Sequence, residues 1–362
     1  MSASLAVSVV VPSHNSVSTL RTALAGIRAS ELARELYEVI VVDDASSDSS
    51  PSVAARYADK VVRLTGGPWG AAYARNRGAE LARGEIVVFV NPDVLIEPDA
   101  ISTVLEMFAE AQVVAVAGSR DETSGAANIV TEYWNLLLRF GERRYAGGAG
   151  DLASGFSAVR RATLIEAGMY DEWRFGIGCL EGIELAQRLH RAARKVPISR
   201  ELQVVHLKRW TVRSVCREVW NRGRVLARSL DYTRTRLAVP SEVVFTLSSA
   251  MPAALLVITL VTLAGAFYPS PSGLVKAMAV AAGVLVANLS LYRFYAKARG
   301  LAFAISVVPL HLVSQGISAA ALCTGWILRN TVGDRTPDAT TQAYAEVGLE
   351  KWPPVPRRYR PG

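Results

Sequence analysis

The chain has 362 residues, with 40 Lys and Arg against 32 Asp and Glu, so its formal net charge is +8. Hydrophobic residues make up 51% and charged residues only 20%, which excludes a disordered chain and a collagen-like repeat. The three cysteines form no CxxC pair, which excludes a zinc knuckle, a dithiol redox motif and a disulfide scaffold.

The chain up to about residue 205 alternates apolar runs with helix-period patterns. Runs rich in valine and isoleucine predict strands at Ala6–Val11, Glu38–Val42, Lys60–Leu64, Glu85–Val90 and Val113–Ala117. The spacing between them predicts helices at Thr19–Ala29, Ser52–Tyr57, Ala71–Ala82 and Asp99–Ala109. This order predicts an α/β domain with a mostly parallel sheet flanked by helices. No basic flank precedes Leu5–Val11, so no secretion signal is expected and the domain should stay in the cytosol.

Acidic and amide side chains follow two of these strands directly. Asp43 and Asp44 come after the second strand, and the turn of Asn91, Pro92 and Asp93 comes after the fourth. Because ligands bind at the carboxyl ends of strands in open parallel sheets, these groups are expected to share one crevice. A single Asp at a strand end is as often a turn former, but two such sites in one domain favour function.

A basic segment follows the α/β region. Nine basic and two acidic residues lie between Lys208 and Arg236. Apolar residues recur there with helical spacing, at Val212, Val215, Cys216, Val219, Trp220, Leu226 and Leu230. The pattern predicts an amphipathic helix in the headgroup layer of anionic membrane lipids; an ordinary surface helix is the alternative. Nucleic-acid binding fits the charge but not a position beside membrane spans, so no nucleic-acid partner is expected.

Three later segments are apolar enough to be membrane spans. Val243–Tyr268 and Leu301–Leu328 carry no charge, and Leu274–Tyr292 carries only Lys276. About 20 apolar residues cross a bilayer as a helix, so about three transmembrane helices are expected. Within the third segment, Pro309, His311 and Gln315 would also permit a kink or a re-entrant hairpin.

Charge around these segments predicts their orientation. Arginines before the first span and after the second place the α/β domain in the cytosol of an integral cell-membrane protein. Three spans would put the tail outside, yet it is basic, and this conflict stays open. The expected divisions are 1–205 for the α/β domain, 206–240 for the interface segment, 241–328 for the membrane region and 329–362 for the basic, proline-containing tail.

Four segments together resemble the family 2 glycosyltransferases, which have a GT-A fold. The segments are Val7–Asn15 (VSVVVPSHN), Val39–Asp48 (VIVVDDASSD), Ala74–Gly78 (ARNRG) and Gly84–Asp93 (GEIVVFVNPD), in the family's order and spacing. The resemblance implies a nucleotide-diphosphate sugar as donor. It also implies donor-binding positions at Pro12, Asn15, Asp43, Asp44, Arg75, Asn76, Asn91 and Arg209.

The resemblance also implies a metal. Asn91-Pro92-Asp93 is similar to the family's DxD motif, with Asn in the first place, so Asp93 is the expected ligand of Mg²⁺ or Mn²⁺. His206 matches a position that lies near the metal or diphosphate in many members. A hard cation with oxygen ligands suits the charge that develops on a departing nucleoside diphosphate.

Further elements resemble the acceptor side and the catalytic helix. Ser154 and Gly155 match an acceptor loop, and Glu181 is the candidate general base with Glu184 in reserve. The chain departs from the family at Gly182, where Asp is expected. The alternative is that a glutamate at the start of a helix only stabilises the helix by interacting with its dipole.

His206-Leu-Lys-Arg-Trp210 partly resembles the QxxRW element of processive members. Trp210 could stack on an acceptor sugar, and the alternative for Arg209 and Trp210 is a membrane-surface anchor. The segment Tyr133–Phe140 could likewise face a lipid or fill the core.

The resulting hypothesis is an inverting, metal-dependent sugar transfer to a lipid-linked glycan or polyprenyl-phosphate acceptor, at the cytosolic membrane face, in cell-envelope polysaccharide biosynthesis. Single transfer is favoured over polymerisation. The alternative is a non-catalytic scaffold that binds nucleotide sugars, because Asn91 and Gly182 depart from the family pattern.

Overall fold

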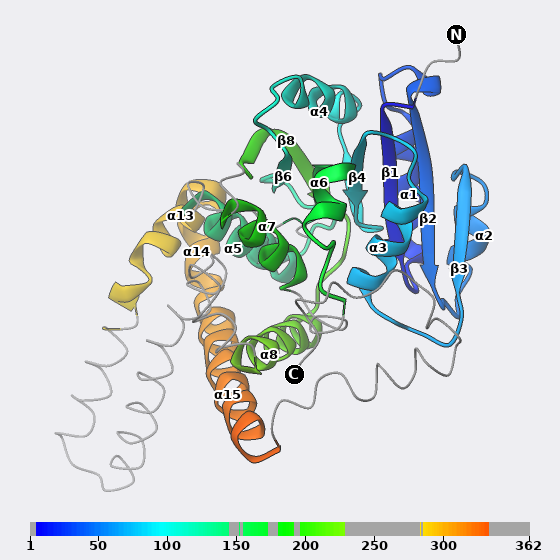
Figure 1. Ribbon diagram of the computed structural model, residues 1–362. Coiled ribbons are helices and arrows are strands. Elements are labelled where there is room, and N and C mark those ends of the chain that lie inside the picture. The colour runs from blue at the N-terminus through cyan, green and yellow to red at the C-terminus, as the bar shows by residue number, and fades with distance from the viewer. Residues whose placement is uncertain are drawn as a thin grey trace, which may run out of the picture. The chain divides into compact units, whose positions relative to one another are not determined.

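The computed structural model describes residues 5–144, 152, 155–172, 180–191, 196–228, 283 and 285–332. These residues divide into two compact units. The first unit holds the described residues of 5–121, 152–191 and 196–208, and the second holds those of 122–144, 209–228 and 283–332. Figure 1 shows that the first unit contains the sheet and the second is helical.

The first unit is built on an eight-stranded sheet in the order β3-β2-β1-β4-β7-β6-β8-β5. Its strands are β1 Val7–Ser13, β2 Tyr37–Asp44, β3 Lys60–Leu64, β4 Ile86–Val90, β5 Val94–Ile96, β6 Ala115–Arg120, β7 Phe156–Arg160 and β8 Ile198–His206. Strands β1 to β4 pair in parallel, as does β6 with β8. The pairs β4–β7, β6–β7 and β5–β8 are antiparallel.

Helices cover both faces of this sheet because successive strand residues point to opposite sides. The helices of this unit are α1 Val17–Arg28, η1 Arg34–Leu36, α2 Ser50–Ala54, α3 Ala71–Leu81, α4 Ala100–Phe108, α6 Arg161–Glu166 and α7 Glu181–Arg191. On β1, Val9 belongs to the apolar cluster that contains α1, α2 and α4 residues. Its neighbour Val10 belongs to the cluster that contains α3, α6 and α7 residues. The result is a three-layer α/β sandwich.

Gly78 permits the close approach of α3 to the sheet. A Cβ atom at this position would lie 2.2 Å from the Cγ1 atom of Val10. Such a contact is far below van der Waals separation, so any side chain there would push α3 away from β1. The glycine of the ARNRG segment is thus explained by helix-to-sheet packing.

The expected strands and helices of the α/β domain are all present, with ends displaced by a few residues. The sheet is mixed, however, because β5, β7 and β8 were not expected and all three form antiparallel pairs. Strand β5 has only three residues, and such a strand depends on its distant partner more than on its own pattern.

The second unit contains only helices among its described residues. They are α5 Ile129–Arg144, α8 Val212–Arg228, α13 Leu289–Arg299, α14 Leu301–Ser306 and α15 Val308–Val332. The side chains of Tyr133, Trp134 and Leu136–Leu138 lie in an apolar cluster with residues of α8, α13 and α14. Side chains of the segment Tyr133–Phe140 therefore fill a core, which is one of the two alternatives given for this segment.

One helical stretch among the described residues, Leu301–Leu328, is long and apolar enough to cross a membrane. A break at Val307 separates it into α14 and α15. The expected span Val243–Tyr268 and most of Leu274–Tyr292 lie outside the described residues. The expected set of three spans is therefore not confirmed.

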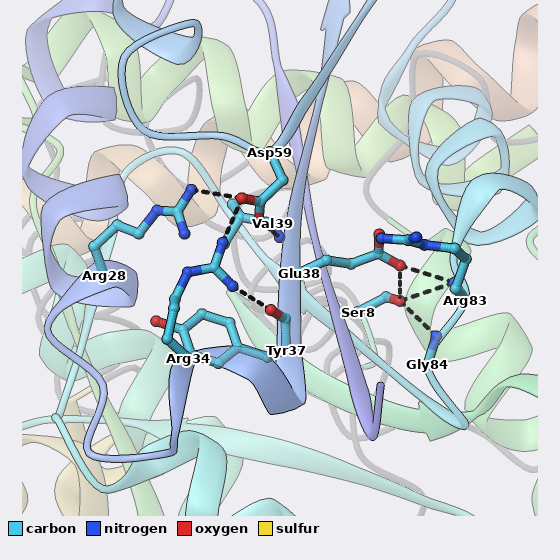
Figure 2. A network of polar contacts seen from close by, with 9 residues as sticks. All are labelled: Ser8, Arg28, Arg34, Tyr37, Glu38, Val39, Asp59, Arg83 and Gly84. Carbon is cyan, nitrogen blue, oxygen red and sulfur yellow. Dashed lines mark hydrogen bonds and ion pairs between the residues drawn. The ribbon is translucent and has the colours of Figure 1, made fainter. Parts of the chain in front are cut away.

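Two ionic networks hold the amino ends of the strands together (Figure 2). Glu38 of β2 accepts a hydrogen bond from the Ser8 hydroxyl of β1 at 2.7 Å and from the Arg83 guanidinium at 2.8 Å. The Ser8 oxygen in turn accepts the backbone N–H of Gly84 at 2.8 Å, just before β4. Nearby, Asp59 accepts the Val39 N–H and pairs with two arginines. These contacts set the alignment of β1, β2 and β4.

The first prediction concerns pH and Glu38. Burial opposes its ionisation, but hydrogen bonds from Arg83 and Ser8 outweigh burial and hold the pKa of Glu38 below its ordinary value of 4.5. A lowered pKa stabilises the fold above pH 4.5, and this stabilisation is lost as the pH falls through the lowered pKa. Glu38→Gln should therefore lower the thermal midpoint of the full chain at pH 7, and the difference from wild type should shrink below pH 4.5.

Glu85→Gln is the matched control for this prediction. Glu85 forms a 2.7 Å ion pair with Arg160, but its side chain is 74% exposed. Exposed pairs contribute little to stability, so this variant should melt like wild type at every pH. Equal midpoints for Glu38→Gln and wild type at pH 7 would contradict the prediction.

Candidate functional site

The carboxyl ends of β1, β2 and β4 lie at one edge of the sheet because these strands are parallel neighbours. Ser13 at the end of β1 is opposite Asp43 at the end of β2. Asn91 follows directly after β4. The parallel register therefore brings the predicted strand-end residues to the same edge.

Asp43 is buried and keeps one carboxylate oxygen without a partner. Its exposed fraction is 1%. The Oδ2 atom accepts the Ser46 N–H at 3.3 Å and lies 3.8 Å from Nε of Arg63. The Oδ1 atom is buried and accepts no hydrogen bond from the residues that the structure describes. Buried polar atoms normally have a partner, so Oδ1 is a free acceptor at the strand-end edge.

Asp44 next to it has both oxygens engaged. Oδ1 accepts the Trp69 N–H at 2.8 Å and Oδ2 accepts the Gly70 N–H at 2.7 Å. Gly70 directly precedes α3, and it has a positive φ of 102°. The carboxylate of Asp44 thus fastens the loop that leads into α3.

The loop after β1 is tied to the loop after β2 by Asn15. The Asn15 side-chain oxygen accepts the N–H groups of Ser47 at 2.9 Å and Asp48 at 3.3 Å. Asn15 has a φ of 47°, a left-handed conformation that asparagine tolerates. Pro12 is buried within β1, opposite Val42. Asn15 therefore shapes this loop, whereas Pro12 lies in the strand before it.

A buried arginine joins three separate parts of the site. Arg75 of α3 is 3% exposed. Its guanidinium donates to Oε1 of Glu181 at 3.0 Å and to Oδ1 of Asn91 at 3.0 Å. It also lies over the ring of Tyr170, 5.5 Å from the ring centroid. Sequence reasoning singled out Arg75, Asn91 and Glu181 separately but did not predict that they meet. It missed Tyr170, which lies in the segment Gly168–Glu172 (GMYDE).

The two candidate base residues on α7 differ in their surroundings. Glu181 is 3% exposed, and its Oε2 atom is buried without a hydrogen-bond partner. Glu184 is held by Arg188, whose Nε donates to Oε1 at 2.9 Å. Arg188 also donates to the Met169 carbonyl at 2.8 Å. Glu181 can accept a proton from a new partner, whereas Glu184 anchors α7 to the preceding loop.

The side-chain nitrogen and oxygen of Asn76 are both hydrogen-bonded to the segment that contains Tyr170 and Glu172. Its nitrogen donates to the Tyr170 carbonyl at 2.9 Å and to Glu172 at 2.7 Å, and its oxygen accepts the Tyr170 N–H at 3.0 Å. Burial raises the pKa of Glu172, against the opposing effects of Arg77 and Asn76. Asn76 therefore positions the segment that carries Tyr170.

Asp93 and His206 are brought together by antiparallel pairing. Val94 of β5 is opposite His206 of β8, and the Asp93 carbonyl accepts the Leu207 N–H at 2.7 Å. Gly155 lies beside both elements, since its carbonyl accepts the Asn91 N–H at 2.8 Å. A Cβ at Gly155 would lie 2.9 Å from Nε2 of His206. The DxD-like turn, Gly155 and His206 are thus close neighbours.

The described residues hold no group of three or more His, Cys, Asp and Glu side chains that could bind a metal by themselves. Asp93 carries a carboxylate and the neighbouring His206 carries an imidazole, so the two residues offer oxygen and nitrogen as potential metal ligands. Mg²⁺ is commonly bound through one or two carboxylates together with substrate phosphates and water. This donor set therefore fits a cation that a diphosphate helps to hold.

The structure does not place three of the predicted site residues, Ser154, Arg209 and Trp210, at this site. Ser154 lies outside the described residues. Arg209 and Trp210 belong to the second unit, where Arg209 is exposed. The Trp210 N–H donates to the Thr131 hydroxyl at 2.8 Å, and its ring lies 5.6 Å from that of Trp134.

Comparison with known proteins agrees with this architecture. Residues 8–168 match the model of the family described as Glycosyl transferase family 2. This part of the chain is similar to the domain of that family. A putative glycosyltransferase, EpsH of Bacillus subtilis, is 38% identical over 99 residues, which cover 26% of this chain and 28% of the relative. The β-monoglucosyldiacylglycerol synthase of Trichormus variabilis is 27% identical over 202 residues, 51% of this chain and 41% of the relative.

The chain thus spans less than half the length of these two curated relatives. Among solved structures, the mannosyltransferase PcManGT from Pyrobaculum calidifontis, in complex with GDP-Man and Mn²⁺, superposes with a TM-score of 0.56. It covers 89% of this chain and 86% of its own, at 19% identity. At that identity the likeness supports the fold alone.

The second prediction separates the two neighbouring aspartates. Asp43→Ala removes a free acceptor and should weaken binding of UDP or GDP by about tenfold or more, the loss expected for one charge-assisted hydrogen bond. Asp44→Ala leaves two N–H groups without their acceptor and should mainly lower the thermal midpoint. Titration calorimetry and thermal melts of both variants test this. Unchanged nucleotide affinity in Asp43→Ala would remove that residue from the donor site.

Proposed function

We propose that this protein is an inverting, metal-dependent glycosyltransferase. It transfers a sugar from a nucleotide-diphosphate sugar to a lipid-linked glycan or polyprenyl-phosphate acceptor at the cytosolic face of the cell membrane. The observation that carries the proposal is the Arg75 bridge, which holds Asn91 and Glu181 together while Oε2 of Glu181 keeps no partner. A lipid acceptor is supported by the relative from Trichormus variabilis, which is by name a glucosyldiacylglycerol synthase.

The donor is held at the strand-end edge. Oδ1 of Asp43 accepts a hydrogen bond from the base or ribose, because it is a buried acceptor without a protein partner. Asp93 and His206 are the residues that would hold Mg²⁺ or Mn²⁺, together with oxygens of the diphosphate. The cation would supply positive charge that offsets the charge developing on the departing nucleoside diphosphate.

The transfer is a single displacement. The acceptor oxygen forms a bond to the anomeric carbon of the sugar as the bond from that carbon to the diphosphate oxygen breaks. Oε2 of Glu181 takes the proton of an acceptor hydroxyl, and the nucleoside diphosphate leaves with the electron pair. Arg75 holds the other oxygen of Glu181 and compensates the charge of this buried carboxylate. A phosphate acceptor, already ionised, would need less help from this base.

The third prediction concerns Asp93. Asp93→Ala should abolish release of nucleoside diphosphate and weaken Mn²⁺-dependent donor binding, because a carboxylate donor to the cation is lost. Asn91→Asp is the matched variant: it keeps an oxygen for Arg75 and restores the carboxylate of the DxD pattern, so turnover should be retained. Wild-type turnover in Asp93→Ala would remove this residue from the mechanism.

The fourth prediction concerns the base. Glu181→Gln keeps a hydrogen-bond acceptor for Arg75 but cannot take a proton, so donor affinity should persist while turnover on a hydroxyl acceptor falls by at least about 10²-fold. Glu184→Gln disturbs the contact with Arg188 and should retain most of the turnover. A panel of nucleotide sugars, with nucleoside diphosphate as readout, measures both. Donor binding without turnover in the wild type would instead support the scaffold alternative.

A further inference from the structure

Helix α15 buries four polar side chains, those of His311, Ser314, Gln315 and Ser318, and exposes several large apolar ones. Its buried polar residues contact neighbouring helices of the same unit: His311 meets the Tyr292 hydroxyl at 2.9 Å, and Ser314 meets the Tyr133 hydroxyl at 2.7 Å. The outward residues are large and apolar, and several are about half exposed or more. They are Ile305 of α14 with Leu312, Val313, Trp326 and Ile327 of α15. A helix that is polar inward and apolar outward is suited to contact with lipid.

Helix α8 packs closely along α15. A Cβ at Gly223 of α8 would lie 2.7 Å from Cβ of Ala321, and a Cβ at Gly325 of α15 would lie 2.6 Å from Cβ of Ala227. Both contacts advance by four residues along each helix, so the helices run in the same direction. Small residues at such a crossing allow two backbones to approach, as is common between helices in membranes.

The glycine contacts also set the register of the two helices. In this register, residues 212–227 of α8 lie beside residues 310–325 of α15. That stretch of α15 rises roughly 22 Å. This length is most of the ~30 Å thickness of a hydrocarbon core. Helix α8 therefore accompanies most of the part of α15 that would have to cross a membrane.

Helix α8 carries charged side chains that would be unfavourable inside the hydrocarbon core of a membrane. Arg213 and Arg217 are exposed, and Arg222 pairs with Glu218 at 2.8 Å. If α15 crossed the bilayer, these charges would lie in hydrocarbon beside it, where charged side chains are strongly disfavoured. At the level of the headgroups, the same arginines would meet anionic lipid phosphates.

We infer that α14 and α15 lie in the plane of the membrane interface instead of crossing it. The outward apolar face rests on the acyl chains, and the arginines of α8 bind anionic headgroups. The partner is a bilayer with anionic lipids. This inference rests on the membrane location in the proposed function but not on its transfer chemistry.

Labelling of single cysteines tests the arrangement. In a full chain with Cys179, Cys216 and Cys323 replaced by serine, a cysteine is introduced at Ser306 or at Asn330, exposed positions before and near the end of α15. A membrane-impermeant maleimide is applied to right-side-out and inside-out vesicles. Ser52→Cys, exposed in the first unit, reports the cytosolic face.

Both flanking cysteines should label from the same face as Ser52→Cys. Labelling of Ser306→Cys and Asn330→Cys from opposite faces would overturn the inference, as would a chain absent from the membrane fraction. If the serine background fails to fold, Leu312→Cys or Ile327→Cys is spin-labelled in a chain that keeps Cys216 as its only native cysteine, and the signal of the labelled chain with Cys216 alone is subtracted. Equal, shallow depth is expected, and a deep Leu312 with a shallow Ile327 would contradict it.

The labelling result does not depend on the turnover measured for the Glu181→Gln variant. A chain that labels as expected but transfers no sugar would refute the proposed function alone. A chain that transfers sugar but exposes Asn330→Cys on the outer face would refute the in-plane arrangement alone.

Discussion

The candidate site depends on one buried guanidinium. Arg75 can be buried only where its charge is paired, and its partners Asn91 and Glu181 come from the end of β4 and the start of α7. Because this charge must be paired, α3, the end of β4 and the start of α7 are held together, although they are separate in the chain. The position of the candidate base, one of its oxygens held and the other unpartnered, follows from that pairing.

Neighbouring carboxylates have different roles at two places in the first unit. Asp44 fastens the loop before α3 with both oxygens, whereas Asp43 beside it retains a free one. Glu184 is held by Arg188, whereas Glu181 one turn earlier keeps Oε2 without a partner. In each pair, one carboxylate stabilises the local backbone and so keeps the other in a fixed position, where a ligand can complete its hydrogen bonding.

The second unit follows a different rule of burial. Its polar groups, among them His311 and Ser314, are directed to neighbouring helices, while Leu312 and Val313 are directed outward. In water this arrangement would expose apolar surface, whereas against lipid the outward apolar side chains lie in an apolar environment. The arginines of α8 restrict how deep such a surface can lie. Hydropathy alone cannot supply this restriction, because it takes account of α15 without the helix beside it.

The sequence by itself determined the α/β class, the strands β1 to β4 and β6, and the strand-end positions of Asp43 and Asp93, because buried parallel strands have a local apolar pattern. Tertiary structure decided the antiparallel strands β5, β7 and β8 and the meeting of Asp93 with His206. It also decided which carboxylates keep a free oxygen. These features depend on partners distant in the chain, such as Arg75 with Glu181, and hydrogen bonding between distant residues leaves no periodic signal in the amino-acid order.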